Sequence, residues 1–326
     1  MNGTLPISLR KPIYPQVATI LLLAAAIFVP AVAGPAAASD QPSPAELVRL
    51  TVANEVAADK DTSVKHLFRS RKETGHGSQT RFYVETSDCM AGMVVANDDQ
   101  PLNAEQLQQE ENHLDGLRNS PEQIRHKQAQ EKEDAEHTLR IVKALPDAFL
   151  YEYAGEQNEA GAIKTANPVV RLKFKPNPDY SPPSRVEQVL TGMKGELWID
   201  EHSRRLLKID GTLFKDVSFG WSILGHLNPG GHFLVEQADA GDGTWDVTHM
   251  SLSFTGKILL FKNLSIKSDE VFSGYQRVPA NTTFAQAVDM LKAEEAKFAQ
   301  DLSGKSAPIS NGQAKNLRLE PEKSPH

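Results

Sequence analysis

Histidines and aspartates form the groupings of this 326-residue chain that most resemble metal sites. None of the ten histidines stands four residues from another beside a glutamate, the spacing that puts two ligands on one helix face. His226 and His232 are six residues apart across a turn, and two ligands in a loop are weak evidence for a metal site. Asp239, Asp242 and Asp246 surround two glycines but lack the offsets and the bidentate glutamate of a calcium loop. We therefore predict no metal and no cofactor, and we interpret the aspartates as a solvated hairpin turn.

Nucleophilic and acid–base chemistry have no clear candidates either. Segment 220–225, Gly-Trp-Ser-Ile-Leu-Gly, resembles a nucleophile elbow around Ser222, but it has one residue too many and lacks the parallel α/β setting of that motif. Cys89 is the only cysteine, and its surroundings indicate a turn between two strands and a structural role. No pair among the 42 acidic residues is marked out for general acid–base work. We predict that the protein is not an enzyme.

The first 38 residues have the layout of a secretory signal peptide. Arg10 and Lys11 precede an apolar run over 17–29, and small residues follow up to Ala38. Pro30 interrupts the run before it reaches the roughly 20 residues that a spanning helix needs. We predict cleavage after Ala38 and a periplasmic or secreted protein; retention of the segment as an anchor is the alternative.

Composition limits the partners of the whole chain. A net charge of −7 argues against nucleic acid, because polyanion binding needs clustered Lys and Arg. It decides nothing about lipids or proteins. Residues 303–326 are polar and contain three prolines, so we expect a disordered tail.

Capping residues and apolar spacing predict the helices. Ser43, Asn103 and Ser120 each precede a helical pattern with a Glu or Gln three residues later. The expected helices cover 43–58, 103–118, 121–144, 184–190 and 283–302. The stretch 97–145 is charged, and its narrow apolar stripes, such as Leu139, Val142 and Leu145, indicate helices that lie on a sheet with most of their surface in water.

Short runs rich in β-branched and aromatic residues, separated by turn residues, predict antiparallel strands. The expected strands are 64–73, 80–86, 90–96, 149–153, 169–175, 195–200, 205–214, 232–238, 245–254 and 257–266. Several alternate apolar and polar residues, which places the apolar side chains on one face. A packed core is the ordinary explanation; a curved sheet whose concave side holds an apolar ligand is the sharper one.

Part of the strand region resembles a known family. The residues Gly-Glu-Leu-Trp-Ile-Asp at 195–200 and Arg-Arg-Leu-Leu-Lys-Ile at 204–209 are similar to a hairpin of LolA/LolB-like periplasmic proteins that sort outer-membrane lipoproteins, and 256–261 fits the same group. The resemblance covers roughly 193–272. It implies an open half-barrel whose concave face, plugged by helices, accepts acyl chains. The charged stretch 97–145 is an addition to the minimal carrier.

We therefore predict an α+β fold: a curved antiparallel sheet, or open half-barrel, with helices packed on the concave face and a charged helical insertion at 97–145. Residues 1–38 are expected to be the signal peptide, 39–302 a single LolA-like domain and 303–326 the tail. The expected apolar groove is lined by Leu197, Ile199, Leu207, Ile209, Phe233, Val235, Met250, Leu252 and Phe254.

The predicted function is that of a non-enzymatic periplasmic carrier or scaffold, with the acyl chain of a lipid or lipoprotein as its partner. The alternative is a cell-envelope module with a filled core, whose helices at 97–145 bind another envelope protein.

Overall fold

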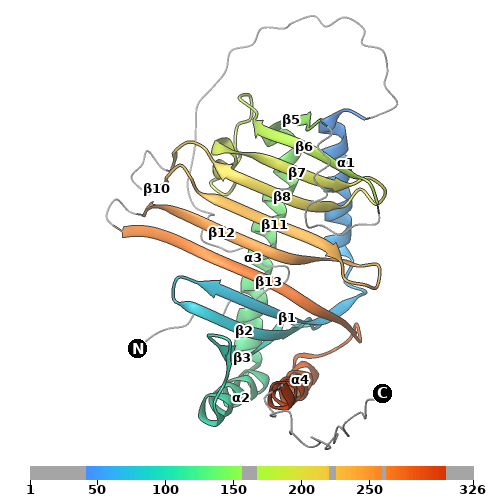
Figure 1. Ribbon diagram of the computed structural model, residues 1–326, viewed down its shortest axis with the longest axis vertical. Helices are drawn as coiled ribbons and strands as arrows, with labels where there is room; N and C mark the ends of the chain where they lie inside the picture. Colours follow the sequence, from blue (N-terminus) through green and yellow to red (C-terminus); the bar gives the residue numbers. More distant parts are fainter. Residues whose placement is uncertain (1–41, 156–166, 220–224, 259–261, 306–326) are drawn as a thin grey trace, which may run out of the picture.

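The protein, described by a computed structural model over residues 42–155, 167–219, 225–258 and 262–305, is built on one antiparallel sheet (Figure 1). The predicted signal peptide lies outside these described residues, as does most of the predicted tail. The strands are β1 (Lys65–Thr74), β2 (Gly77–Val84), β3 (Ala91–Asn97), β4 (Gln100–Pro101), β5 (Phe149–Tyr153), β6 (Val169–Pro176), β7 (Met193–Asp200), β8 (Leu206–Leu213), β9 (Val217–Phe219), β10 (Gly225–Leu227), β11 (His232–Asp239), β12 (Trp245–Ile258) and β13 (Lys262–Val278).

The strand order leaves the sheet open. Eleven strands follow one another as β4-β3-β2-β1-β13-β12-β11-β8-β7-β6-β5, while β10 pairs with the end of β12 and β9 pairs with β10. The edge strands β4 and β5 do not pair with each other. Together with the helices packed against the sheet, this order confirms the predicted α+β class with an open antiparallel sheet.

The helices predicted from Ser43, Asn103 and Ser120 begin at these capping residues, whereas the one predicted over 184–190 is a 3₁₀ helix without a side-chain cap. The helices are α1 (Pro44–Lys60), α2 (Ala104–Arg118), α3 (Pro121–Ala148), the 3₁₀ helix η1 (Glu187–Gly192) and α4 (Phe284–Lys305). Asn103 and Gln106 form a reciprocal capping box at α2, and Ser120 Oγ accepts from Gln123 N at α3. The charged stretch 97–145 therefore contains two helices, and α3 continues slightly beyond the predicted end.

The predicted strand over 257–266 is wrong. Its first residues complete β12, its last ones begin β13, and Ile258 of β12 is paired with Lys262 of β13. β13 then runs to Val278, between β12 and β1 in the middle of the sheet. Polar side chains such as Ser268 and Glu270 occupy its buried positions, so the alternation that marks a strand is absent from its sequence.

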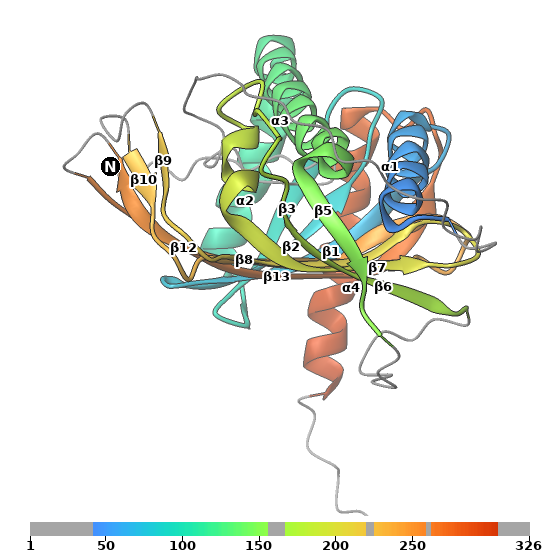
Figure 2. The same ribbon diagram turned by 90° about the horizontal axis from the view of Figure 1, so that it is seen from above.

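Helices lie on both faces of the sheet. Seen edge-on, the sheet curves toward α1 and α3, which lie on its concave side, while α4 extends past the other side (Figure 2). On that outer side Phe298 of α4 packs edge-to-face against Phe82 of β2, with 5.8 Å between ring centroids. Tyr83, the next residue, points to the inner face and packs against Phe68. The protein thus has a core under α1 and α3 and a second one between β1–β3, α2 and α4.

Candidate functional site

An apolar cavity of about 140 Å³ lies between α3 and the concave face of the sheet. Helix α3 provides one stripe of its wall, and η1, α1 and the strands β6, β8, β11 and β12 provide the rest. Glu55 and Asp59 of α1 are the carboxylates at its border. Its lining residues are Glu55, Asp59, Ala135, Thr138, Leu139, Ile141, Val142, Leu145, Phe149, Phe174, Leu190, Leu206, Ile209, Phe233, Val235, Gln237, Val247 and Met250.

The helix that covers this cavity is only lightly buried. Over the length of α3, the buried residues are Glu131, Leu145 and Ala148. The stripe over 135–145 has the spacing of one helix face, so each residue on it points to the sheet. Leu139, Val142 and Leu145, whose spacing is visible in the sequence, all belong to it. The remaining surface of α3 is mostly polar and in contact with water.

The nine predicted groove residues divide into three groups. Ile209, Phe233, Val235 and Met250 line the apolar cavity. A second group is packed in the surrounding core rather than facing free space: Leu197, Ile199, Leu252 and Phe254. Leu207 is buried but lines neither this cavity nor the polar one described below.

A β-bulge explains the position of Leu207. Trp198 of β7 is paired with Lys208, but the next residue, Ile199, is paired with Leu206. Leu207 is therefore the extra residue of the bulge, and Leu206 takes the place on the cavity wall. Strict alternation along β8 could not reveal this shift.

Phe149, Phe174 and Leu190 also line the cavity, although the sequence analysis did not single them out. The two phenylalanines lie on predicted strands, and their rings are 4.6 Å apart between centroids. Their convergence depends on β5 pairing with β6 at the sheet edge, which spacing along the chain does not specify.

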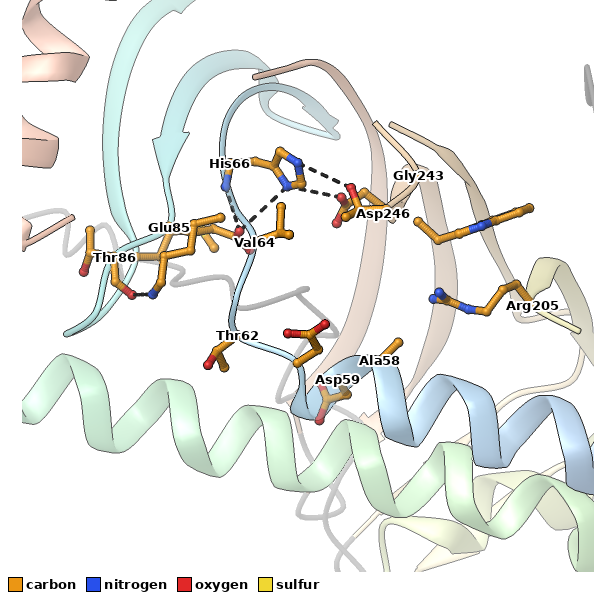
Figure 3. A pocket seen from close by; sticks show the side chains of 15 residues that line it. Ala58, Asp59, Thr62, Val64, His66, Glu85, Thr86, Arg205, Gly243 and Asp246 are labelled. Atoms are coloured by element: carbon orange, nitrogen blue, oxygen red, sulfur yellow. Dashed lines mark hydrogen bonds and ion pairs between the residues drawn. The ribbon is translucent and has the colours of Figure 1, made fainter. Parts of the chain in front are cut away.

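A second, polar cavity of about 230 Å³ lies where the C-terminal end of α1 faces β12 (Figure 3). Acidic side chains enter it from three elements: Asp59 and Asp61 from α1 and the residue after it, Glu85 from the end of β2, and Asp246 from β12. The lining residues are Ala58, Asp59, Asp61, Thr62, Val64, Lys65, His66, Glu85, Thr86, Met90, Arg205, Gly243, Thr244, Trp245 and Asp246.

His66 lies at the centre of the acidic side chains of this cavity. Its Nε2 lies 3.1 Å from Asp242 Oδ2, and its Nδ1 lies 3.4 Å from Asp246 Oδ2 and 4.0 Å from Glu85 Oε2. The Tyr275 ring packs edge-on against the imidazole. Hydrogen bonds from Thr244, Arg277 and His66 hold the pKa of Asp242 far below its usual range.

The interpretation of the aspartates as a solvated turn is therefore wrong for two of them. Asp239 only caps the turn, accepting from the backbone N–H groups of Gly241 and Gly243. Asp242 binds His66 and Arg277, and Asp246 is buried against His66. Because His66 precedes these residues by some 180 positions, local sequence carried no sign of the contact.

The two cavities adjoin, because three elements contribute neighbouring residues to both. In α1, Asp59 lines both cavities, Ala58 the polar one and Glu55 the apolar one. In β8 and just before it, Arg205 lines the polar cavity and Leu206 the apolar one.

In β12 the change from polar to apolar lining falls between Asp246 and Val247. The boundary itself is a bidentate ion pair, in which Arg205 Nε and Nη2 donate to Glu55 at 2.8 and 3.0 Å.

The residues considered for other chemistry are separated or occupied. His226 and His232 are opposite Lys257 and Ser253, four residues apart along β12, and His232 Nε2 lies 2.8 Å from Asp210 Oδ1. Among the described residues no group of three or more His, Cys, Asp or Glu could hold a metal ion. Ser222 lies outside the described residues.

Cys89 is buried in the connection between β2 and β3, where Thr86 Oγ1 donates to its carbonyl oxygen. In the part of the chain that the structure describes, no helix is long and apolar enough to cross a membrane.

Comparison with known proteins adds little to these observations. No family model matches the chain, and no curated protein matches it. A crystal structure of an outer membrane lipoprotein-sorting protein domain from Vibrio parahaemolyticus is similar over 75% of this chain and 99% of its own, with 11% identity and a TM-score of 0.29. A likeness at this TM-score carries no argument about fold or function, which rest on the residues described above.

Proposed function

We propose that this protein is a non-enzymatic carrier of the bacterial cell envelope that binds an acyl chain of a lipid or an acylated protein. The observation that carries the proposal is the apolar cavity between α3 and the concave face. Ligand sites for apolar molecules are concave and mostly apolar, with few polar groups at the border. The two carboxylates of α1 are such a border here. The predicted signal peptide and the LolA/LolB-like hairpin at 195–209 point to the same class of function.

The size of the cavity implies that α3 moves during binding. About 140 Å³ is less than the roughly 300–1,000 Å³ of typical ligand pockets. A whole acyl chain therefore needs more room than the closed form offers. Helix α3 is the wall that can provide it, since it buries only three residues over its length, whereas the opposite wall is the hydrogen-bonded sheet.

A binding titration tests the proposal. Delipidated protein is titrated with a fluorescent dodecanoyl ester whose head is uncharged, and saturable binding with a blue-shifted emission is expected. Ala135→Phe places a ring in the cavity and should weaken binding at least tenfold, because it occupies the space the chain needs.

Ala129→Phe is the matched control, because Ala129 is exposed on the same helix and does not line the cavity. It should bind the ester as the unaltered protein does. Absence of saturable binding in the unaltered protein would contradict the carrier and favour an interaction module with a filled core. Equal weakening by both substitutions would show that the ester binds elsewhere.

A further inference from the structure

We infer that the polar cavity is the head-group half of the ligand site, and that it selects amphiphiles whose head carries an ammonium group. This inference rests on the proposed function, because it assigns the second cavity to the same ligand. Its basis is the geometry of the boundary, where α1, β8 and β12 each pass from polar to apolar lining within a few residues. A molecule with an apolar tail in one cavity has its head at the entrance of the other.

The charges of the polar cavity favour a cation. Four carboxylates line it, from Asp59, Asp61, Glu85 and Asp246, against two permanent cations, Lys65 and Arg205. The guanidinium of Arg205 is already neutralised by Glu55, with which it forms the bidentate pair at the boundary. A carboxylate or phosphate head would therefore meet an excess of negative charge.

Two of these carboxylates are available to a ligand. Asp59 and Asp61 form no ion pair with the described residues, and Asp61 accepts hydrogen bonds from the side chain and the backbone N–H of Ser63. Asp59 lines both cavities, so its carboxylate stands where the head would leave the apolar space. Figure 3 shows Asp59 at the end of α1 and Asp246 on the other side of the cavity. An ammonium group between them would be attracted from both walls.

The ring of Trp245 makes a further contribution to this preference. Trp245 lines the polar cavity, and the Arg205 guanidinium lies over its ring at 5.8 Å from the centroid. The face of an indole ring attracts cations, so a wall that contains Trp245 adds to the preference for a cationic head.

A competition experiment tests the inference with three dodecyl amphiphiles that differ only in the head. Dodecylamine, dodecanoate and monolauroylglycerol, each below its micelle concentration at neutral pH, displace the uncharged fluorescent ester. We expect dodecylamine to compete at about tenfold lower concentration than dodecanoate. In Asp59→Asn/Asp61→Asn the ratio should fall about fivefold, since each exposed charge pair is worth up to about 1 kcal/mol, while monolauroylglycerol competes unchanged.

Glu152→Gln/Asp179→Asn is the matched control, because both acids are exposed and neither lines a cavity. It should keep the full preference for the amine. If the ester binds and the three amphiphiles compete equally well, or if dodecanoate competes best, the head-group assignment is overturned. The proposed carrier function is then unaffected. If the ester does not bind at all, the proposed function fails and this inference falls with it.

Discussion

At the residue scale, a charged pair, Glu270 and Lys72, lies on neighbouring strands of the sheet with the glutamate buried. Glu270 of β13 is 2% exposed; Ser70 Oγ donates to its carboxylate at 2.5 Å, and Lys72 Nζ lies 4.0 Å away. Burial raises the pKa of Glu270 and lowers the pKa of Lys72 to about 8. Each partner reduces the desolvation cost of the other without removing it, which is usual for ion pairs inside a protein.

The pair of Lys72 and Glu270 predicts that the stability of the protein depends on pH. Lys72 has a pKa of about 8 in the folded protein against 10.5 in the unfolded chain, so the folded state binds fewer protons between these values. Stability therefore gains a contribution as pH rises from about 8 to 10.5, of up to about 3 kcal/mol. The measurement is the unfolding free energy of the unaltered protein and of Lys72→Met/Glu270→Gln at several pH values. The unaltered protein should become more stable relative to the variant as the pH rises over this range.

The double substitution avoids a buried carboxylate left without its lysine. Lys173→Met, at an exposed position of β6, is the control and should give a difference that is flat with pH. Equal profiles for the two variants would contradict the assignment of a lowered pKa to Lys72.

At the element scale, the side chain of Glu131 connects the middle of α3 to the segment before β3. The buried carboxylate of Glu131 accepts the Met90 N–H with both oxygens, at 3.1 Å each, and Lys127 pairs with it one turn away at 3.1 Å. Met90 also lines the polar cavity. Glu131 is thus a charge-assisted link between the helix over the apolar cavity and the strand layer beside the polar one.

Glu131→Ala should loosen α3 without unfolding the protein. It leaves the Met90 N–H without this acceptor, at a cost of about 1–3 kcal/mol, and the loss is local to the helix. We expect faster amide exchange over the middle of α3 and faster association of the dodecanoyl ester, because the cavity opens more often. Glu133→Ala, at an exposed position of the same helix, is the control. Unchanged exchange in Glu131→Ala would show that other contacts hold the helix.

Local patterns account for much of this architecture. The start of α3 at Ser120 and the stripe containing Leu139, Val142 and Leu145 follow from capping and 3.6-residue spacing, and both are present in the structure. The bulge that exchanges Leu207 for Leu206 does not follow, because it depends on how β8 pairs with β7.

The polar cavity could not be predicted at all. It joins residues from α1, the β2–β3 region and the β11–β12 turn. Such contacts are set by strand order and by the curvature of the sheet, which no short window of sequence contains.

At the scale of the whole molecule, the two faces of the sheet differ in chemistry. Opposite the cavities, a row of polar side chains crosses β6, β7, β8, β11 and β12. Trp198 has the Arg171 guanidinium over its ring at 4.7 Å and the Lys208 ammonium at 5.3 Å, and Glu236 connects Lys208 with His249. This part of the outer face suits water, so an apolar ligand of these strands belongs on the concave side.

Export and lipid loading belong together in this proposal and can be measured together. Expressed with residues 1–38 in a bacterium with a periplasm, the protein should be recovered there with Ser39 as its N-terminus, because the segment ends in small residues suited to cleavage. Mass spectrometry of its organic extract should detect an amphiphile. The same chain from residue 39, made in the cytoplasm, is the control for lipid acquired during lysis. An intact N-terminus in the membrane fraction would instead identify the segment as an anchor. Equal amounts of lipid in both preparations would show that lipid loading does not depend on export.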